Sequence, residues 1–202
     1  MPIALVPRER LRRWLGNFEE RHGSTTLSLA GGRLDGRADD GSTFAAAAPF
    51  GATLEEPSLD ALEAACTPPP DWGVLLVRKG GFAVARLAGD QILESKVGQR
   101  HVQGRTKAGG QSQQRFARRR DNQARAAYEA AADHAARIVA DAPVLVVGGD
   151  HGAIEAVLAD QRLRSVAGRV VGEFRTVPDP RRGVLESAVR DACSVTIDVT
   201  NA

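Results

Sequence analysis

The spacing of hydrophobic residues near the start of the chain is typical of a helix. Four large apolar side chains follow the i, i+3, i+4, i+7 pattern of an amphipathic helix: Leu11, Trp14, Leu15 and Phe18. This pattern predicts a helix over 8–22 that ends near Gly23. Residues 25–29 alternate and predict a strand, which pairs with 43–47 after a polar turn over 31–41. We therefore expect an N-terminal helix followed by a β-hairpin.

A proline-rich stretch then divides the chain. Ser58 can cap a short helix over 59–65. Residues 67–71 contain three consecutive prolines, which cannot continue a helix and stiffen an extended segment. We place a domain boundary there, with an N-terminal extension over 1–70 and a second domain over 71–202.

Beyond the boundary, the pattern changes from three strands to alternating elements. Turn residues at 79–81 and 89–90 separate three expected strands, and 98–110, which has four glycines, is expected to be an exposed loop. A helix of about 28 residues, roughly 40 Å long, follows, with Ser112 as its expected N-cap. Later strands are expected over 143–147, 166–174 and 195–199, and helices over 151–160 and 181–193. This order predicts an α/β fold of the α+β type with a mixed sheet.

Composition limits the classes of protein that the chain can represent. With 202 residues and 43% hydrophobic content, the chain can bury one good core. Cys66 and Cys193 are isolated, which favours a reducing compartment and argues against a structural metal. The N-terminal residues lack a secretory pattern, and no apolar run approaches the ~20 residues that span a bilayer. We expect a cytoplasmic protein without a membrane partner, cofactor or metal.

Charge is concentrated in one segment. Residues 96–125 hold nine basic side chains and one acid, Asp121, for a formal charge of +8; the rest of the chain has 18 basic and 24 acidic residues, for −6. The basic residues are Lys96, Arg100, Arg105, Lys107, Arg115, Arg118, Arg119, Arg120 and Arg125. Such polarity favours a polyanion at one end of a molecule and repels it elsewhere.

Within this segment, the tripeptide Gly109-Gly110-Gln111 precedes the Arg-rich helix. Adjacent glycines let the main chain approach a ligand without a Cβ in the way. A glutamine does not titrate near neutral pH, so Gln111 cannot be a general base like His or Glu. Its carboxamide can instead hold a water for attack, and its backbone N–H can donate to an oxyanion. The tripeptide therefore indicates a chemical tip that depends on a second macromolecule for the rest of its site.

The tip and the first helical turns resemble a known catalytic domain. The run Gly109-Gly110-Gln111-Ser112-x-x-Arg115-Phe116-Ala117-Arg118-x-Arg120 is similar to the middle domain of class I peptide-chain release factors of eukaryotes and archaea. Over about 72–193, the chain also resembles the Vms-like release factor family and its actinobacterial relatives. That resemblance implies an RNase H-like fold and hydrolysis of the ester between a nascent chain and tRNA on a stalled large ribosomal subunit.

Two departures from the family pattern change this expectation. Residues 1–70 show none of the motifs of a stop-codon-reading domain, so we expect hydrolysis that does not depend on a codon. The Vms-like pattern Gly-x-x-Gln is met by Gly110-Gln111-Ser112-Gln113, so the essential glutamine is Gln111 or Gln113. We favour Gln111, because the match that continues to Arg120 fixes the register.

The remaining candidate residues are predicted to bind RNA or to cap a helix. We expect the exposed loop and the start of the helix to contact large-subunit rRNA and peptidyl-tRNA through Arg100, His101, Arg105, Lys107, Arg115, Arg118, Arg119 and Arg120. Asp150 follows a buried strand and is expected to cap the next helix rather than to do chemistry. The alternatives are a non-catalytic ribosome-binding rescue factor and a nuclease that acts at the tRNA 3′ end. Away from the ribosome, we expect a monomer.

Overall fold

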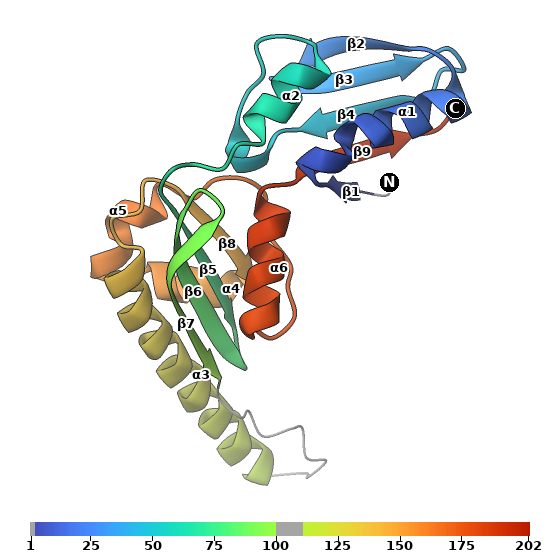
Figure 1. Ribbon diagram of the computed structural model, residues 1–202. Helices are drawn as coiled ribbons and strands as arrows, with labels where there is room; N and C mark the ends of the chain where they lie inside the picture. The colour runs from blue at the N-terminus through green and yellow to red at the C-terminus, as the bar shows by residue number, and fades with distance from the viewer. Residues whose placement is uncertain (1–2, 100–110) are drawn as a thin grey trace. The chain divides into compact units, whose positions relative to one another are not determined.

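The computed structural model describes residues 3–99 and 111–202, and it describes side chains in these ranges except in 111–123. The chain forms two compact units. The N-terminal unit comprises Met1–Pro68 together with Val189–Ala202, and the central unit comprises Pro69–Ala188 (Figure 1). The expected linker over 67–71 therefore contains the point at which the chain first passes from one unit to the other.

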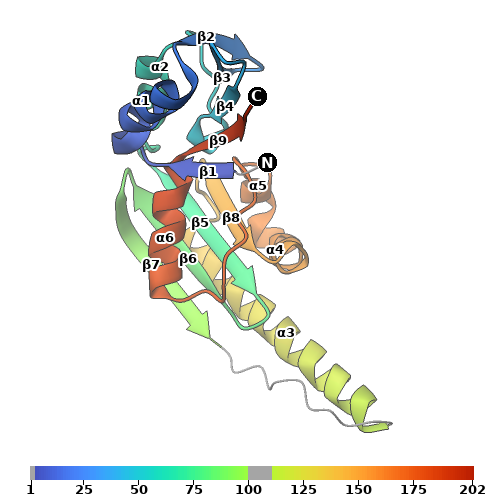
Figure 2. The same ribbon diagram turned by 90° about the vertical axis from the view of Figure 1, so that its right-hand side faces the viewer.

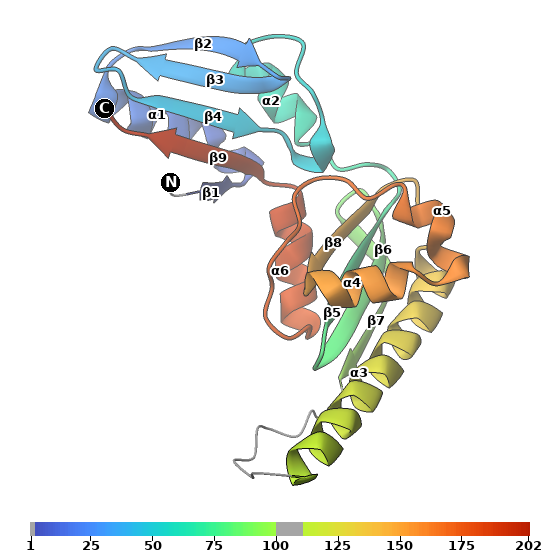
Figure 3. The same cartoon turned by 180° about the vertical axis from the view of Figure 1, so that it is seen from behind.

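The N-terminal unit is built on a five-stranded antiparallel sheet. Its strands, in spatial order, are β1 (Ile3–Val6), β9 (Val195–Thr200), β4 (Thr43–Ala47), β3 (Arg33–Ala38) and β2 (Thr25–Ala30). Two short 3-10 turns, η1 (Arg8–Arg10) and η2 (Pro49–Gly51), lie between these elements. Helices α1 (Leu11–His22) and α2 (Leu59–Ala65) cover one face of the sheet (Figures 1 and 3). Leu11, Phe18 and Leu62 from these helices pack there against Leu34, Phe44 and Ile197.

Two features of this unit differ from the sequence expectation. The segment 31–41 is not only a turn, because β3 occupies most of it. A Cβ on Gly36 in this strand would lie 2.2 Å from the Phe44 ring, so the glycine makes room for an aromatic side chain on the next strand. The last strand, expected in the second domain, instead pairs with β1 and β4 of the N-terminal unit.

The central unit has a four-stranded mixed sheet. Its strands, in spatial order, are β7 (Gln91–Gln99), β6 (Gly81–Ala88), β5 (Trp72–Arg78) and β8 (Leu145–Gly149). The first three form the antiparallel meander expected from the sequence, and β8 joins β5 in parallel. Helices α3 (Gln111–Ile138) and α4 (His151–Leu158) pack against this sheet. The α/β class and the mixed sheet are thereby confirmed.

The remaining segment of the central unit departs from the predicted strand over 166–174. A 3-10 turn, η3 (Gln161–Leu163), leads into the short helix α5 (Arg164–Ala167). Only isolated bridges, at Val170 and Arg175, then connect to β8. Gly172 adopts a positive φ of 73°, a conformation that interrupts an extended strand. The last helix, α6 (Arg182–Ala192), agrees with its prediction.

Candidate functional site

Helix α3 carries the residues for which the sequence predicts chemistry. It runs for 28 residues, which confirms the predicted length. It begins at Gln111, one residue earlier than expected, so Ser112 lies inside the helix and is not its N-cap. An N-cap residue has a non-helical backbone outside the first turn, and Ser112 does not meet that condition.

The second half of α3 is anchored in the core of the central unit. Among the residues with described side chains, Ala127 is the first buried residue of the helix, and Ala131, Ala135 and Ile138 continue the buried stripe against the sheet. Ala127 lies 16 residues beyond Gln111, or about 24 Å at 1.5 Å per residue. Figures 1 and 2 show the first half of α3 extending beyond the end of β7. We call residues 111–123 the arm and residues 124–138 the anchored half.

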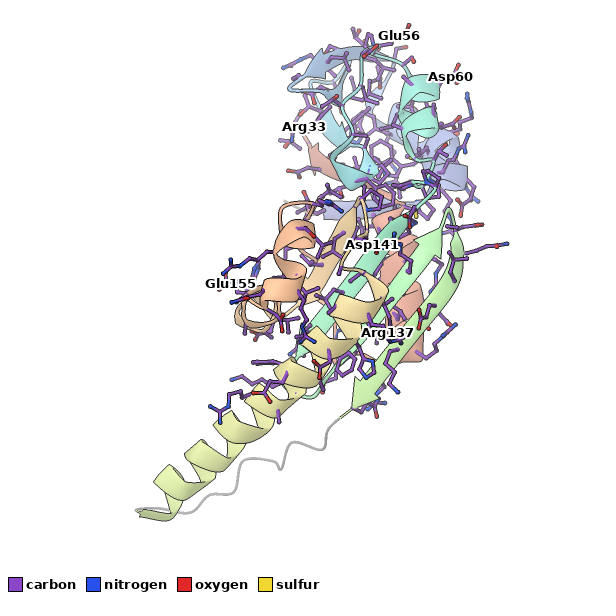
Figure 4. All side chains as sticks on the ribbon, turned by 90° about the vertical axis from the view of Figure 1, so that its left-hand side faces the viewer. Arg33, Glu56, Asp60, Arg137, Asp141 and Glu155 are labelled. Carbon is purple, nitrogen blue, oxygen red and sulfur yellow. The ribbon has the colours of Figure 1, made fainter. Side chains whose placement is uncertain are left out.

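Polar and aromatic contacts fix the anchored half from the side. Arg137 forms an ion pair with Glu94 of β7, and Figure 4 shows Arg137 on the side of α3 that faces this strand. Asp133, one turn earlier in the helix, pairs with Arg162 of η3 at 2.8 Å. The His134 ring stacks on Phe82 of β6, with 5.5 Å between ring centroids. Although exposed ion pairs contribute little each, the three contacts together tie the anchored half to β6, β7 and η3.

The C-terminal end of α3 is also held in place. Arg169 donates from Nη1 to the carbonyl oxygens of Asp141 (3.1 Å) and Ala142 (3.0 Å), just after the last helical residue. Arg86 of β6 pairs with the Asp141 carboxylate at 2.9 Å. A cation near the end of a helix also interacts favourably with the helix dipole. The end of α3 farthest from Gln111 is therefore fixed to the sheet.

A close-packed cluster lies where β7 ends, one residue before the undescribed segment. A Cβ on Gly98 would lie 2.3 Å from the Phe82 ring, and a Cβ on Gly81 would lie 2.4 Å from the Gly98 carbonyl oxygen. Phe82 in turn stacks on His134. This cluster joins the end of β7 to the anchored half of α3. Gly98 and Gln99 were expected to begin the exposed loop over 98–110, but they belong to β7, because Gly98 packs closely against Phe82.

The predicted site residues divide into two groups. Six lie on the arm, where the structure describes the backbone alone: Gln111, Gln113, Arg115, Arg118, Arg119 and Arg120. The others lie outside the described residues: Arg100, His101, Arg105, Lys107, Gly109 and Gly110. The helix places both glutamines in its first turn, so its backbone does not distinguish Gln111 from Gln113. Gln111 stays the predicted essential glutamine, on the sequence match alone.

The start of a helix of this length has its own electrostatic character. The first four N–H groups of an α-helix, which here include that of Gln111, have no partner inside the helix. Aligned peptide dipoles place about half a positive charge at the same end. The anchored half has two basic and two acidic residues, whereas the arm has four arginines and one acid. Positive charge on α3 is therefore concentrated in the arm.

The rival site at Asp150 is explained by capping. The Asp150 carboxylate accepts a hydrogen bond from the backbone N–H of Ala153 at 3.1 Å, which confirms its predicted role at the start of α4. His151 stacks on Phe174, with ring centroids 3.5 Å apart. Burial raises the pKa of Tyr128, and the negative charge of Asp150 adds to the effect. These contacts describe a packed helix start.

The described residues show neither a metal site nor a membrane span. Within the described ranges, no three His, Cys, Asp or Glu side chains gather closely enough to hold a metal ion. None of the helices described here combines the length and apolar character needed to cross a bilayer.

Comparisons with known proteins bear on the same part of the chain. A model of the family described as actinobacteria/chloroflexi VLRF1 release factor matches residues 70–198. Among solved structures, one titled "Vms1 mitochondrial localization core" is similar at 11% sequence identity and a TM-score of 0.45, covering 93% of this chain and 80% of that one. No curated protein matched. Because the family model spans well over half of its residues, the chain belongs to the VLRF1 release factor family of actinobacteria and chloroflexi, the Vms-like assignment expected from its Gly-Gly-Gln motif.

Proposed function

We propose that this protein is a codon-independent peptidyl-tRNA hydrolase that frees nascent chains from stalled large ribosomal subunits. Membership of a release factor family supports this reaction class. The observation that carries the proposal is the place of Gln111, at the first residue of a 28-residue helix whose second half is anchored in the core, where Ala127 is buried about 24 Å from Gln111. A rigid helix of this kind can deliver its end into a narrow site while the rest of the protein stays outside.

The chemistry proposed for the tip is positioning and electrostatic stabilisation. The Gln111 carboxamide holds the attacking water beside the ester carbonyl, and its backbone N–H donates to the oxyanion or the departing ribose oxygen. Gly109 and Gly110 allow the main chain to come close to the tRNA end. As the water oxygen bonds to the ester carbon and the bond to the ribose oxygen breaks, one proton of the water passes to the departing ribose oxygen. No group on the tip takes up or releases this proton, so the tip depends on the surrounding ribosomal RNA and bound water to complete the site.

The basic residues are proposed to deliver and hold the tip. The four arginines of the arm and the basic residues of 100–107 would contact phosphates of rRNA and of the tRNA acceptor end. Phosphate contacts orient a protein on RNA but carry little sequence information. This agrees with a hydrolase that acts on any stalled chain. We also propose that the protein is cytoplasmic and is a monomer until it binds the ribosome.

Two matched variants test the assignment of the glutamine. Large subunits that carry labelled peptidyl-tRNA would be incubated with Gln111→Ala and with Gln113→Ala. We expect Gln111→Ala to slow release by about 10²–10³, as loss of one oxyanion or positioning group does elsewhere, and Gln113→Ala to change it by less than about threefold. The reverse order of effects would assign the role to Gln113. Full activity in both variants would contradict the proposed mechanism.

A further inference from the structure

The N-terminal unit has a sheet face that none of its own described helices covers. Helices α1 and α2 pack on the opposite face, as Figure 4 shows by the positions of Arg33 and Asp60 on opposite sides of the sheet. On the uncovered face, strand pairing aligns one row of side chains across four strands: Ser28, Asp35, Ala45 and Asp198. Arg37, Thr43 and Thr200 form the next row.

These two rows line a pocket of about 280 Å³. Ala45 stands at its centre, on the strand between those that carry Asp35 and Asp198. The two aspartates are therefore two strand spacings apart, or roughly 10 Å between Cα atoms. The short alanine side chain leaves space between two carboxylates that stand on either side of it.

Each of these aspartates has an unsatisfied oxygen. Oδ1 of Asp35 and Oδ1 of Asp198 are both buried, and neither has a hydrogen-bond partner among the described residues. Buried polar atoms in folded proteins nearly always have a partner, because a carboxylate oxygen without a donor loses its hydration and gains nothing in return. The pocket therefore suits a group that brings both N–H donors and a positive charge, namely an ammonium or a guanidinium.

The size and surroundings of the pocket indicate that this group belongs to a protein. Pockets for drug-sized ligands run from ~300 to ~1,000 Å³, so this one is small and fits a single long side chain. Next to it, on β1, Ile3 pairs with Asp198 and is 64% exposed, and Leu5 is 42% exposed. Exposed apolar side chains beside a specific polar pocket are typical of a protein interface.

Charge distinguishes a protein partner from RNA. The N-terminal unit has eight basic and twelve acidic residues, and both carboxylates of the pocket would repel phosphates. We propose that this sheet face binds a basic segment of a partner protein, whose arginine or lysine side chain enters the pocket between Asp35 and Asp198. The exposed Arg37 at the rim can donate to a main-chain carbonyl of the same segment. This role is independent of peptide release at the other unit.

The test uses the whole ¹⁵N-labelled chain and two short peptides. One is acetyl-Leu-Thr-Arg-Thr-Leu-amide, and the other has Glu in place of Arg. We expect the arginine peptide to shift the amide signals of Ser28, Asp35 and Asp198 saturably, and the glutamate peptide to leave them unchanged. The double variant Asp35→Asn with Asp198→Asn should bind at least tenfold more weakly. The matched control, Glu55→Gln with Glu56→Gln, removes two charges from an exposed loop of the same unit and should bind normally.

A second variant keeps the test valid if the asparagine variant unfolds. Ala45→Leu fills the pocket but leaves both carboxylates. It should weaken binding of the arginine peptide at least tenfold, as the double asparagine variant does. Absence of saturable shifts with the arginine peptide would overturn the proposal, and so would equal binding by the asparagine variant. Shifts of the same amides by oligouridylate would also overturn it in favour of RNA. Because no ribosome is present, these outcomes do not depend on hydrolase activity.

Discussion

Two glycines near the start of α4 differ in whether the structure could accept a side chain at their position. Gly149, at the end of β8, has a φ of 114°, and a Cβ there would lie 2.1 Å from the carbonyl oxygen of Val77. The turn into α4 therefore needs a residue without a side chain, both for its backbone conformation and for space. A Cβ on Gly152, three residues later, would lie 3.6 Å from Asp150 Oδ1, which is an ordinary van der Waals distance.

The first prediction compares these two glycines. Gly149→Ala should lower the free energy of unfolding by about 2 kcal/mol or more, because it adds backbone strain and a clash with the main chain of β5. Gly152→Ala lies inside α4 and should be neutral or stabilise the protein by about 0.5–1 kcal/mol. Urea denaturation of both variants measures the difference. Equal stability of the two variants would contradict the described geometry.

The second prediction concerns Cys66, a buried residue of the N-terminal unit. Burial raises the pKa of its thiol to about 11. The unfolded chain therefore loses this proton at lower pH than the folded protein does, so stability should fall as pH rises between about 9 and 11. Thermal unfolding of the wild type and of Cys66→Ala across this range tests the point. The variant should show a shallower decline, and parallel declines would exclude the thiol as the cause.

At the scale of elements, α3 does two separate tasks. Its anchored half belongs to the core, whereas the arm carries the residues for which the sequence predicts chemistry. The sequence predicted the length of this helix well because its apolar stripe repeats regularly over the anchored half. It placed the start one residue late, because a serine that can cap a helix lies next to the true first residue.

Other elements were harder to predict because their causes lie far away in the sequence. The strand β3 was missed because the reason for a glycine at position 36, the space that the Phe44 ring needs, lies on the next strand. The strand predicted over 166–174 was wrong, because Val166 is buried in the short helix α5 and Gly172 interrupts the extended chain after it. The partners of β9 and the pocket between Asp35 and Asp198 both depend on strand order, which periodicity does not reveal.

The third prediction separates the two tasks of α3. A proline at position 124 removes a helix hydrogen bond and clashes with the preceding turn, but it suits the first position of a new helix that starts there. Ala124→Pro should therefore leave the anchored half folded, with a change in unfolding free energy of less than about 1 kcal/mol, while the arm loses its fixed direction. Peptide release should fall at least about tenfold. The control Ala124→Gly should keep most of the activity, and full release by the proline variant would show that a rigid arm is not needed.

At the scale of the whole molecule, charge is divided between two separate parts of the chain. Residues 96–125 have a formal charge of +8, and the N-terminal unit has an excess of four acids. The proposed account assigns RNA to the first and a basic protein segment to the second. One protein can thus recognise two chemically different parts of a ribonucleoprotein without a shared site.

The fourth prediction tests the RNA contacts. Affinity for large subunits should fall with salt, and each lost phosphate contact should reduce the slope of log K against log [salt] by about 0.7–0.9. Replacing Arg115, Arg118, Arg119 and Arg120 together by glutamine should lower the slope by up to about 3. The control replaces Arg13 and Arg21, two exposed arginines of α1, and should leave the slope unchanged. An equal effect of both sets would indicate non-specific charge attraction.

The most direct measurement follows both products of one reaction. Purified large subunits that hold peptidyl-tRNA are incubated with the wild type or with Gln111→Ala, and the released peptide and the length of the tRNA are measured together. The account predicts free peptide and a tRNA with an intact 3′ end from the wild type, with release slowed by about 10²–10³ in the variant. A shortened tRNA would indicate a nuclease. Binding without any product would show a rescue factor that docks and does not catalyse, and either result would contradict the proposed hydrolase.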